Sequence, residues 1–146
     1  MTNVVDFDLR SLTIEPVVDD LRDALEIAMP MLMPAIERYG RNVGVEDIEK
    51  DLIAFNSLLW IVYTGGTPIA AFTTCVVRHP KRKTLMIEFM GGKHMSLWMK
   101  AAINVLRAAA KKGKLDAIEA DGRTGFSRIA AANGFRETHR HFEMEI

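Results

Sequence analysis

The chain has 146 residues, of which 49% are hydrophobic and 26% charged, a composition typical of a globular domain rather than a disordered chain. Its 19 basic and 19 acidic residues cancel, so no overall field predicts binding to nucleic acid or to a membrane surface. The single cysteine, Cys75, excludes an internal disulfide and lies in an apolar run, where we expect it to be buried and inert. With no signal peptide and no apolar stretch of about 18 residues, we expect one cytoplasmic domain over residues 1–146.

The first third of the chain predicts a strand followed by helices. Residues 1–15 alternate loosely between apolar and polar side chains and indicate an edge strand. Pro16 suits the first position of a helix, but Pro30 and Pro34 interrupt the apolar stripe that follows. We therefore expect a kinked or split pair of helices. Residues 29–33 hold three methionines, which either pack in the core, the favoured interpretation, or form a flexible lid over a substrate.

The middle of the chain predicts three antiparallel strands in succession. After a short helix over about residues 45–55, two runs rich in β-branched and aromatic side chains cover residues 58–63 and 68–77. The turn between these runs holds two glycines, which is a strong hairpin signal. A basic turn at residues 80–83 then leads into a third strand over residues 85–90.

The strongest pattern lies over residues 84–112, where an apolar strand is followed by a glycine pair and a long amphipathic helix. The strand is apolar at nearly every position, which predicts a central strand covered on both faces. Ser96 is the predicted N-cap of the helix, and Gly113 ends it. Gly91 and Gly92 adjoin the helix start, where unpaired amides and the positive end of the dipole make a candidate anion site.

The end of the chain predicts a strand, a short helix and a final strand. A right-handed crossover places a strand over residues 115–121 parallel to residues 85–90. Thr124 is the predicted cap of a helix that runs to about residue 132. Residues 135–146 form the last predicted strand, with a polar beginning and alternating apolar side chains at its end.

This order of elements resembles the GNAT (GCN5-related N-acetyltransferase) fold. Residues 123–128 and the helix ending in Gly134 and Phe135 resemble the family's fourth helix and the Gly-Phe pair before its last strand. A narrower resemblance, to small GNAT-like proteins encoded by tailed phages, rests on Gly122, Arg123, Gly125, Phe126 and Arg128. The resemblance implies an α/β (α+β) domain whose mixed central sheet has antiparallel N-terminal strands, a parallel pair in the middle, and helices on both faces.

The resemblance also implies transfer of an acyl group from acetyl-CoA to the amine of a small molecule or protein. In the family the two parallel strands splay apart, the pantetheine arm enters between them, and amides after the fourth strand hold the pyrophosphate. By resemblance the cofactor-binding residues are Phe89, Met90, Gly91, Gly92, Lys93, His94 and Met95. The family's Gln/Arg-x-x-Gly-x-Gly/Ala pattern is absent, and Ala130 stands where the family often has a tyrosine as general acid.

Glu88 is the first candidate catalytic residue because it is the one carboxylate in an apolar strand. If Met86 and Met90 share its face, desolvation should raise its pKa, as a base for an ammonium substrate requires. The alternative is a structural ion pair between Glu88 and an Arg or Lys across the sheet. Asp121 is the second catalytic candidate, because ligands of open α/β sheets gather where strands end.

Two further residues are candidates for binding the substrate. Glu119 alternates onto the same strand face as Asp121, where both either bind a cationic amine or face solvent. Arg123 either binds substrate or pairs with one of these carboxylates. His139 and His141 share one face of the last strand, but no third ligand accompanies them, so no metal is predicted.

A second hypothesis is that the chain keeps the fold without the activity. It would then be a structural or interaction protein, as a homodimer or as a component of a phage particle or its assembly. The absent glycine pattern and Ala130 favour this hypothesis, as would an exposed apolar patch at residues 29–33.

Overall fold

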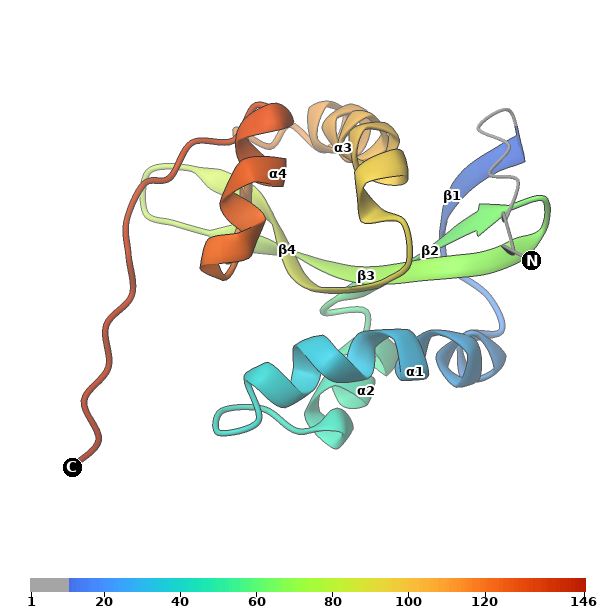
Figure 1. Ribbon diagram of the computed structural model, residues 1–146, viewed down its shortest axis with the longest axis horizontal. Coiled ribbons are helices and arrows are strands. Elements are labelled where there is room, and N and C mark those ends of the chain that lie inside the picture. Colours follow the sequence, from blue (N-terminus) through green and yellow to red (C-terminus); the bar gives the residue numbers. More distant parts are fainter. Residues whose placement is uncertain (1–10) are drawn as a thin grey trace, which may run out of the picture.

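Residues 11–146 are described by a computed structural model, in which one mixed sheet carries helices on both faces (Figure 1). The elements in chain order are β1 (Leu12–Pro16), α1 (Leu21–Arg38), α2 (Val45–Ile53), β2 (Leu58–Thr64), β3 (Thr67–Arg78), β4 (Lys83–Gly92), α3 (Met95–Lys112), β5 (Ala117–Ala120), the 3-10 turn η2 (Thr124–Phe126) and α4 (Ser127–Ala132). The predicted mixed α/β fold is therefore confirmed.

The sheet has the order β1-β2-β3-β4-β5. The first four strands are antiparallel neighbours, whereas β5 is parallel to β4, as the crossover through α3 predicts. Helices α3 and α4 cover one face, and α1 and α2 cover the other (Figure 1). β4 is thus covered on both faces, which explains why its sequence is apolar at nearly every position.

Two cores lie on either side of the sheet. In the first, the rings of Trp60, Phe72 and Trp98 stack in sequence between the sheet and α3, with centroid distances of 5.8 and 6.3 Å. The second core packs the buried face of α1, including Leu32, against β2 and α2. The methionines of residues 29–33 lie partly buried against this second core, so the prediction of core packing there is confirmed.

Helix α1 differs from the prediction because it is a single helix that contains both Pro30 and Pro34. The two prolines lie on its exposed side, while the face that includes Ala28 and Leu32 packs on the sheet. Packing of this face offsets the backbone hydrogen bonds that the prolines remove. Pro16 does not begin a helix; it is the last residue of β1.

The ends of three later elements also differ from the prediction. Helix α3 begins at Met95, so Ser96 lies inside the helix, and the N-cap position is His94 with a φ of 60°. The indole of Trp98 donates to the Lys93 carbonyl at 2.8 Å and fixes this start. α4 begins at Ser127, after the turn η2, and β5 covers four residues rather than seven. No helix within residues 11–146 is long and apolar enough to cross a membrane.

The predicted last strand is absent from the structure. Phe135 packs against the first core, but residues 136–146, which we call the tail, leave α4 as extended chain (Figure 1). The tail contacts the loop after α1, where Arg41 donates to Glu145 at 2.6 Å. The side chains of Phe142 and Met144 are 87% and 86% exposed. An alternating sequence fits a strand, yet a strand needs a neighbour, and none pairs with the tail among the described residues.

Candidate active site between β4 and β5

The two parallel strands pair over four residues and then separate. Their register ends at Ile87 and Ala120, while β4 continues to Gly92. Ile87 pairs with Thr74 of β3 and Met90 with Phe72, so two β4 residues lie opposite one β3 residue. Such a β-bulge bends the strand and increases its twist. The bulge therefore contributes to the separation of β4 from β5.

A cleft of about 160 Å³ opens where the strands part. Its lining comes from both helical layers and from the strand ends: Ala35, Arg38, Tyr39, Ile87, Glu88, Met90, Met95, Ala120, Asp121, Gly122, Arg123, Gly125, Phe126 and Ile129. Both predicted catalytic residues, Glu88 and Asp121, thus share one cleft with Arg123. Arg38 and Tyr39, which the sequence did not single out, complete the side formed by α1.

Glu88 lies in the bulge and is half-buried. The Ser57 hydroxyl donates a hydrogen bond to its Oε1 at 2.8 Å. Burial raises the pKa of Glu88, and the charge of Asp51 adds to this; the hydrogen bonds from Ser57 and Cys75 act in the opposite direction without cancelling the rise. The contacts of Glu88 with Ser57 and Cys75 differ from the structural ion pair considered as an alternative.

Ser57 and Cys75 reach Glu88 from two other elements. The amides of Asn56 and Ser57 both donate to the carbonyl of Asp51, which folds the chain tightly between α2 and β2. Burial, followed by the Glu88 charge, raises the pKa of the Cys75 thiol to about 11. Cys75 therefore stays protonated at neutral pH and donates to Glu88, in keeping with the expected lack of reactivity.

Gly91 and Gly92 have packing roles that the sequence did not reveal. A Cβ on Gly91 would lie 1.9 Å from the carbonyl oxygen of Met31, so the glycine lets α1 pack directly on β4. Gly92 has a φ of 129°, and a Cβ there would lie 2.4 Å from the Cα of Ala70. Close backbone approach is therefore sufficient to explain the glycine pair.

The amides of the predicted cofactor segment divide into two groups. Those of Phe89 and Lys93 donate to β3, to the Thr73 hydroxyl at 3.3 Å and the Ile69 carbonyl at 2.9 Å. Because amides alternate along a strand, those of Met90 and Gly92 point to the opposite edge of β4, which β5 has left. α3 begins at Met95, directly after the N-cap residue His94, and the first amides of a helix have no intrahelical acceptor.

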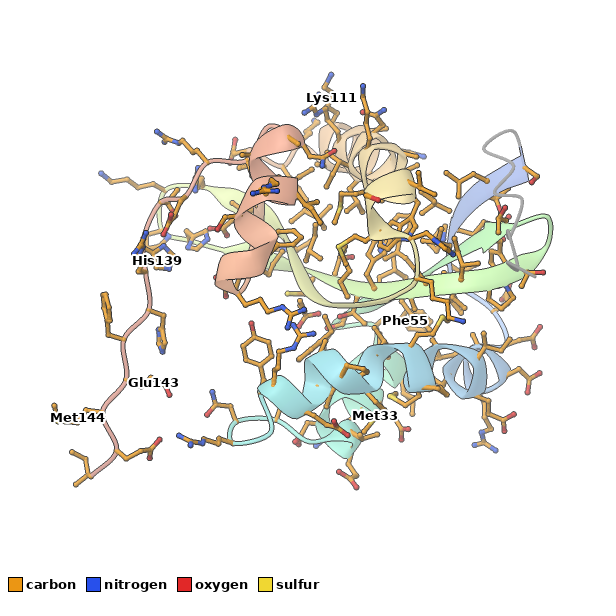
Figure 2. The ribbon with its side chains drawn as sticks, in the orientation of Figure 1. Met33, Phe55, Lys111, His139, Glu143 and Met144 are labelled. Carbon is orange, nitrogen blue, oxygen red and sulfur yellow. The ribbon has the colours of Figure 1, made fainter. Side chains whose placement is uncertain are left out.

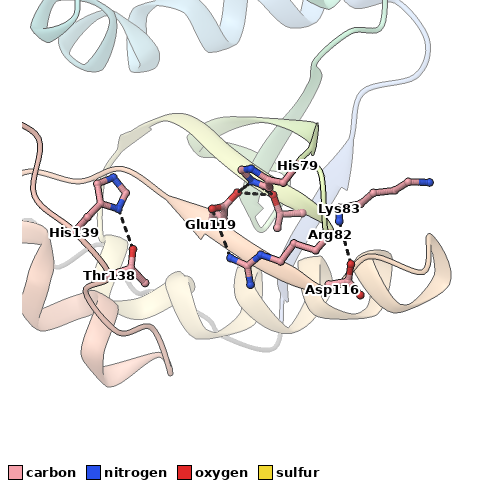
Figure 3. A network of polar contacts seen from close by, with 8 residues as sticks. His79, Arg82, Lys83, Asp116, Glu119, Thr138 and His139 are labelled. Atoms are coloured by element: carbon pink, nitrogen blue, oxygen red, sulfur yellow. Dashed lines mark hydrogen bonds and ion pairs between the residues drawn. The ribbon is translucent and has the colours of Figure 1, made fainter.

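Glu119 does not share the cleft with Asp121, contrary to the prediction. It accepts hydrogen bonds from Thr84 and, at 2.8 Å, from His79, and Arg82 lies 3.9 Å away (Figure 3). These bonds lower the pKa of Glu119. Glu119 lies opposite Met86 in the pairing of β4 with β5, so its side chain projects from one face of the sheet. Asp121 lies beyond the end of β5, so the alternation of side chains along a strand does not apply to it.

Comparison with solved structures identifies the fold. This chain is similar to an aminoglycoside acetyltransferase from an uncultured soil metagenomic sample in complex with sisomicin, with a TM-score of 0.67 and 14% identity. The similarity covers 94% of this chain and 97% of that one. It is also similar to an aminoglycoside N-acetyltransferase in complex with CoA, with a TM-score of 0.67 and 13% identity over 92% of this chain and 94% of that one. A third similar structure is that of a predicted acetyltransferase with acetyl-CoA from Clostridium acetobutylicum, with a TM-score of 0.65 and 15% identity over 92% of this chain and 96% of that one. No protein-family model and no curated protein sequence matches the chain.

Together with the parted strands, these neighbours show that the chain has the GNAT fold. At 13–15% identity the likeness concerns the fold, and the chemistry has to be argued from this chain's own cleft.

Proposed function

We propose that this protein is an N-acyltransferase that moves an acyl group from acetyl-CoA to a primary amine. The observation that carries the proposal is the cleft at the end of the β4–β5 pairing, with the half-buried carboxylate of Glu88 in its wall. Structural neighbours that are acetyltransferases with CoA or acetyl-CoA support it.

Groups in the cleft and at the start of α3 support a role in binding acetyl-CoA. Its volume of about 160 Å³ suits the thioester end and pantetheine arm rather than the nucleotide. The amides of Met90 and Gly92 face the parted edge and would bond the amide groups of the arm, while Met95 and Phe126 provide apolar walls. The start of α3, with Lys93 beside it, would hold the pyrophosphate. When bound, acetyl-CoA supplies an activated acyl carbon for attack by an amine.

Glu88 is the proposed general base, acting directly or through a water molecule. An amine arrives mostly as ammonium, since the pKa of a free primary amine is about 10. A carboxylate with a raised pKa is better matched to accepting that proton near neutral pH. Ser57 would hold Oε1 of Glu88 in place for this proton transfer.

The polar rim of the cleft indicates the kind of acceptor. Asp121 would attract the ammonium group, in place of the predicted pair of Asp121 and Glu119. Arg38 and Arg123 lie on the same cleft from α1 and from the loop after β5. Two guanidinium groups favour an amine that also carries a carboxylate or phosphate.

The test is a set of acetyl-transfer assays that follow CoA thiol release with a panel of primary amines, including sisomicin and amines with carboxylate or phosphate groups. Glu88→Gln should lower turnover by about 100-fold or more while acetyl-CoA affinity is kept. Glu119→Gln, on the neighbouring strand but outside the cleft, is the matched control and should retain its rate. An unchanged rate in Glu88→Gln would remove Glu88 from the mechanism.

A second candidate function is an interaction or assembly subunit that keeps the fold without the chemistry, including the phage-particle role. The packing roles of Gly91 and Gly92 favour it, because they account for the glycine pair without a cofactor. It predicts no acetyl-CoA binding, so a calorimetric titration with acetyl-CoA separates the two candidates.

A further inference from the structure

We propose that a second cavity, near the start of β4, binds an unpaired base of a single-stranded nucleic acid, and that a rim of lysine and arginine side chains holds the neighbouring phosphates. The candidate active site lies near the other end of β4, so this proposal does not depend on the proposed function. Equal numbers of acidic and basic residues exclude a field over the whole molecule, but they allow a local one.

The cavity has a volume of about 260 Å³ and lies where β3 extends beyond the first residue of β2. Leu58 of β2 pairs with Thr74, so within the described part of the chain residues 75–78 of β3 have no strand on that side. The walls are mostly apolar and come from the sheet, the loop after α2 and the end of α3. An apolar cavity of about 150 Å³ already accommodates benzene, so this one is large enough for the ring system of a base.

An aromatic ring and an amide side chain line the cavity from the loop after α2. Phe55 is 60% exposed and has a φ of 56°. A left-handed backbone is uncommon for a bulky residue, and such strain is often found at ligand sites. An exposed aromatic ring beside an apolar cavity suits the stacking of a base. Asn56 is also exposed and has no side-chain hydrogen bond within residues 11–146, so its amide is available for the edge of that base.

One half of the basic rim continues the apolar wall along the sheet. Val76 and Leu85 lie opposite each other in the β3–β4 pairing, and both line the cavity. Arg78 and Lys83 form the opposite pair two residues further on, so they project from the same face about 7 Å away. Two cations directly opposite each other destabilise a sheet. A phosphate group bound between them would remove this repulsion.

The end of α3 provides the other half of the rim. Gly113 lines the cavity, and Lys112 and Lys114 flank it in the chain. Lys112 also complements the helix dipole, but that role does not explain the cations of the hairpin. Backbone contacts join the two halves, because the Lys83 amide donates to the Asp116 carboxylate at 3.0 Å and the Asp116 amide donates to the Lys83 carbonyl at 2.8 Å (Figure 3). The Lys83 ammonium group therefore stays available for a ligand.

The chain itself does not neutralise the rim. Within residues 11–146 no ion pair or side-chain hydrogen bond involves its six exposed cations, which are Arg78, Lys81, Lys83, Lys111, Lys112 and Lys114. Figure 2 shows Lys111 projecting outward from α3. In the same hairpin His79 and Arg82 instead contact Glu119. Unpaired, exposed cations of this kind bind phosphates and release the counterions of a nucleic acid strand.

The shape of this surface favours a nucleic acid strand over a membrane. Side chains that anchor a protein on a membrane insert apolar groups below the charged ones. Here Trp60 and Leu85 are buried in the walls of the cavity, while the cations project around it. The rim also extends over both the hairpin and the end of α3, which is more than one phosphate needs, so a strand fits it better than a free nucleotide.

The first test is the fluorescence anisotropy of labelled single strands of about 12 nucleotides, RNA and DNA in parallel, over a range of salt concentrations. The wild type should bind, with an affinity that falls as salt rises. Lys83→Gln combined with Lys112→Gln should weaken binding about tenfold or more and reduce the salt slope by about 0.7 for each lysine. The control combines Arg22→Gln, in the first turn of α1, with Lys100→Gln, in the first half of α3, and should bind like the wild type. No binding of either strand at low salt, or equal weakening in both double variants, would overturn the proposal.

The second test asks whether an unpaired base enters the cavity. Phe55→Gly removes the ring, and glycine adopts the same backbone without strain, so the variant should melt close to the wild type. It should nevertheless bind the single strand about tenfold more weakly, because the stacking contact is lost. A duplex of the same sequence should bind more weakly than the single strand, since its bases are paired. The proposal is wrong if Phe55→Gly binds like the wild type, if the duplex binds as tightly, or if an equal concentration of mononucleotide displaces the strand.

Discussion

At the scale of single residues, the site depends on how Glu88 is surrounded. Its carboxylate accepts from Ser57, 31 positions earlier in the chain, and neither residue type nor spacing predicts that contact. The sequence could predict that a lone carboxylate in a buried strand has a raised pKa, because desolvation follows from the apolar neighbours. It could not predict which hydroxyl and thiol would hold it, because those positions depend on the turn after α2 and on the register of β3.

The raised pKa of Glu88 predicts a pH dependence of stability. The folded chain holds this proton more tightly than the unfolded chain, so stability falls as pH rises above the ordinary value of 4.5 and through the higher folded-state value. Glu88→Gln removes this loss. The melting temperature of the variant should therefore rise relative to that of the wild type as the pH increases from 4 to 8.

Glu119→Gln is the matched comparison for this melting series, because the pKa of Glu119 is lowered. Its contribution is present above pH 4.5 and lost as pH falls through the lower folded-state value. This variant should therefore be less stable than the wild type at pH 8, and the deficit should shrink toward low pH. Parallel melting curves for both variants at every pH would contradict the assigned environments.

Gly91→Ala tests the close approach of α1 to β4. A Cβ at 1.9 Å from the Met31 carbonyl oxygen forces the helix away from the strand, so we expect a loss of about 1–3 kcal/mol in the free energy of unfolding. Gly125→Ala is the control, since a Cβ there meets nothing within 4 Å, and its unfolding midpoint in urea should stay close to wild type. Equal midpoints for the two variants would show that Gly91 is not needed for packing.

At the scale of elements, hydrophobic periodicity was enough to predict most of the sheet. β2, β3 and β4 have apolar, β-branched and aromatic side chains because the sheet buries both faces there. The same reasoning placed α3 and the parallel β5. Local rules failed at α1, where two prolines predict a break but the packed face keeps one helix. They also failed at the tail, where the pattern is that of a strand without a neighbour.

Replacing Pro30 by Ala should stabilise the protein. The proline is exposed and inside α1, where Pro is about 3 kcal/mol less favourable than Ala. Against this, Pro restricts the unfolded chain, which stabilises the folded protein by up to about 1 kcal/mol. We expect a net gain of about 2 kcal/mol in urea unfolding. Pro80→Ala, in the β3–β4 turn outside any helix, should give no gain. A destabilised Pro30→Ala would mean that α1 requires the proline at this position.

At the scale of the whole molecule, the fold places this cleft where two strands part between two helical layers. α1 provides Arg38 and Tyr39 from one layer, and α3 and α4 provide Met95 and Ile129 from the other. Element order alone could predict that β4 and β5 are parallel neighbours, and the family resemblance implied that they part. The bulge at Glu88 and the arginine from α1 became visible only once the chain was folded.

Calorimetric titration with acetyl-CoA tests the central claim, that the gap between β4 and β5 is a cofactor site, most directly. The wild type should bind one equivalent per chain, and Ala120→Phe, which fills the cleft from the end of β5, should bind at least tenfold more weakly while melting normally. No heat of binding at millimolar acetyl-CoA, or equal affinity in a folded Ala120→Phe variant, would contradict the account.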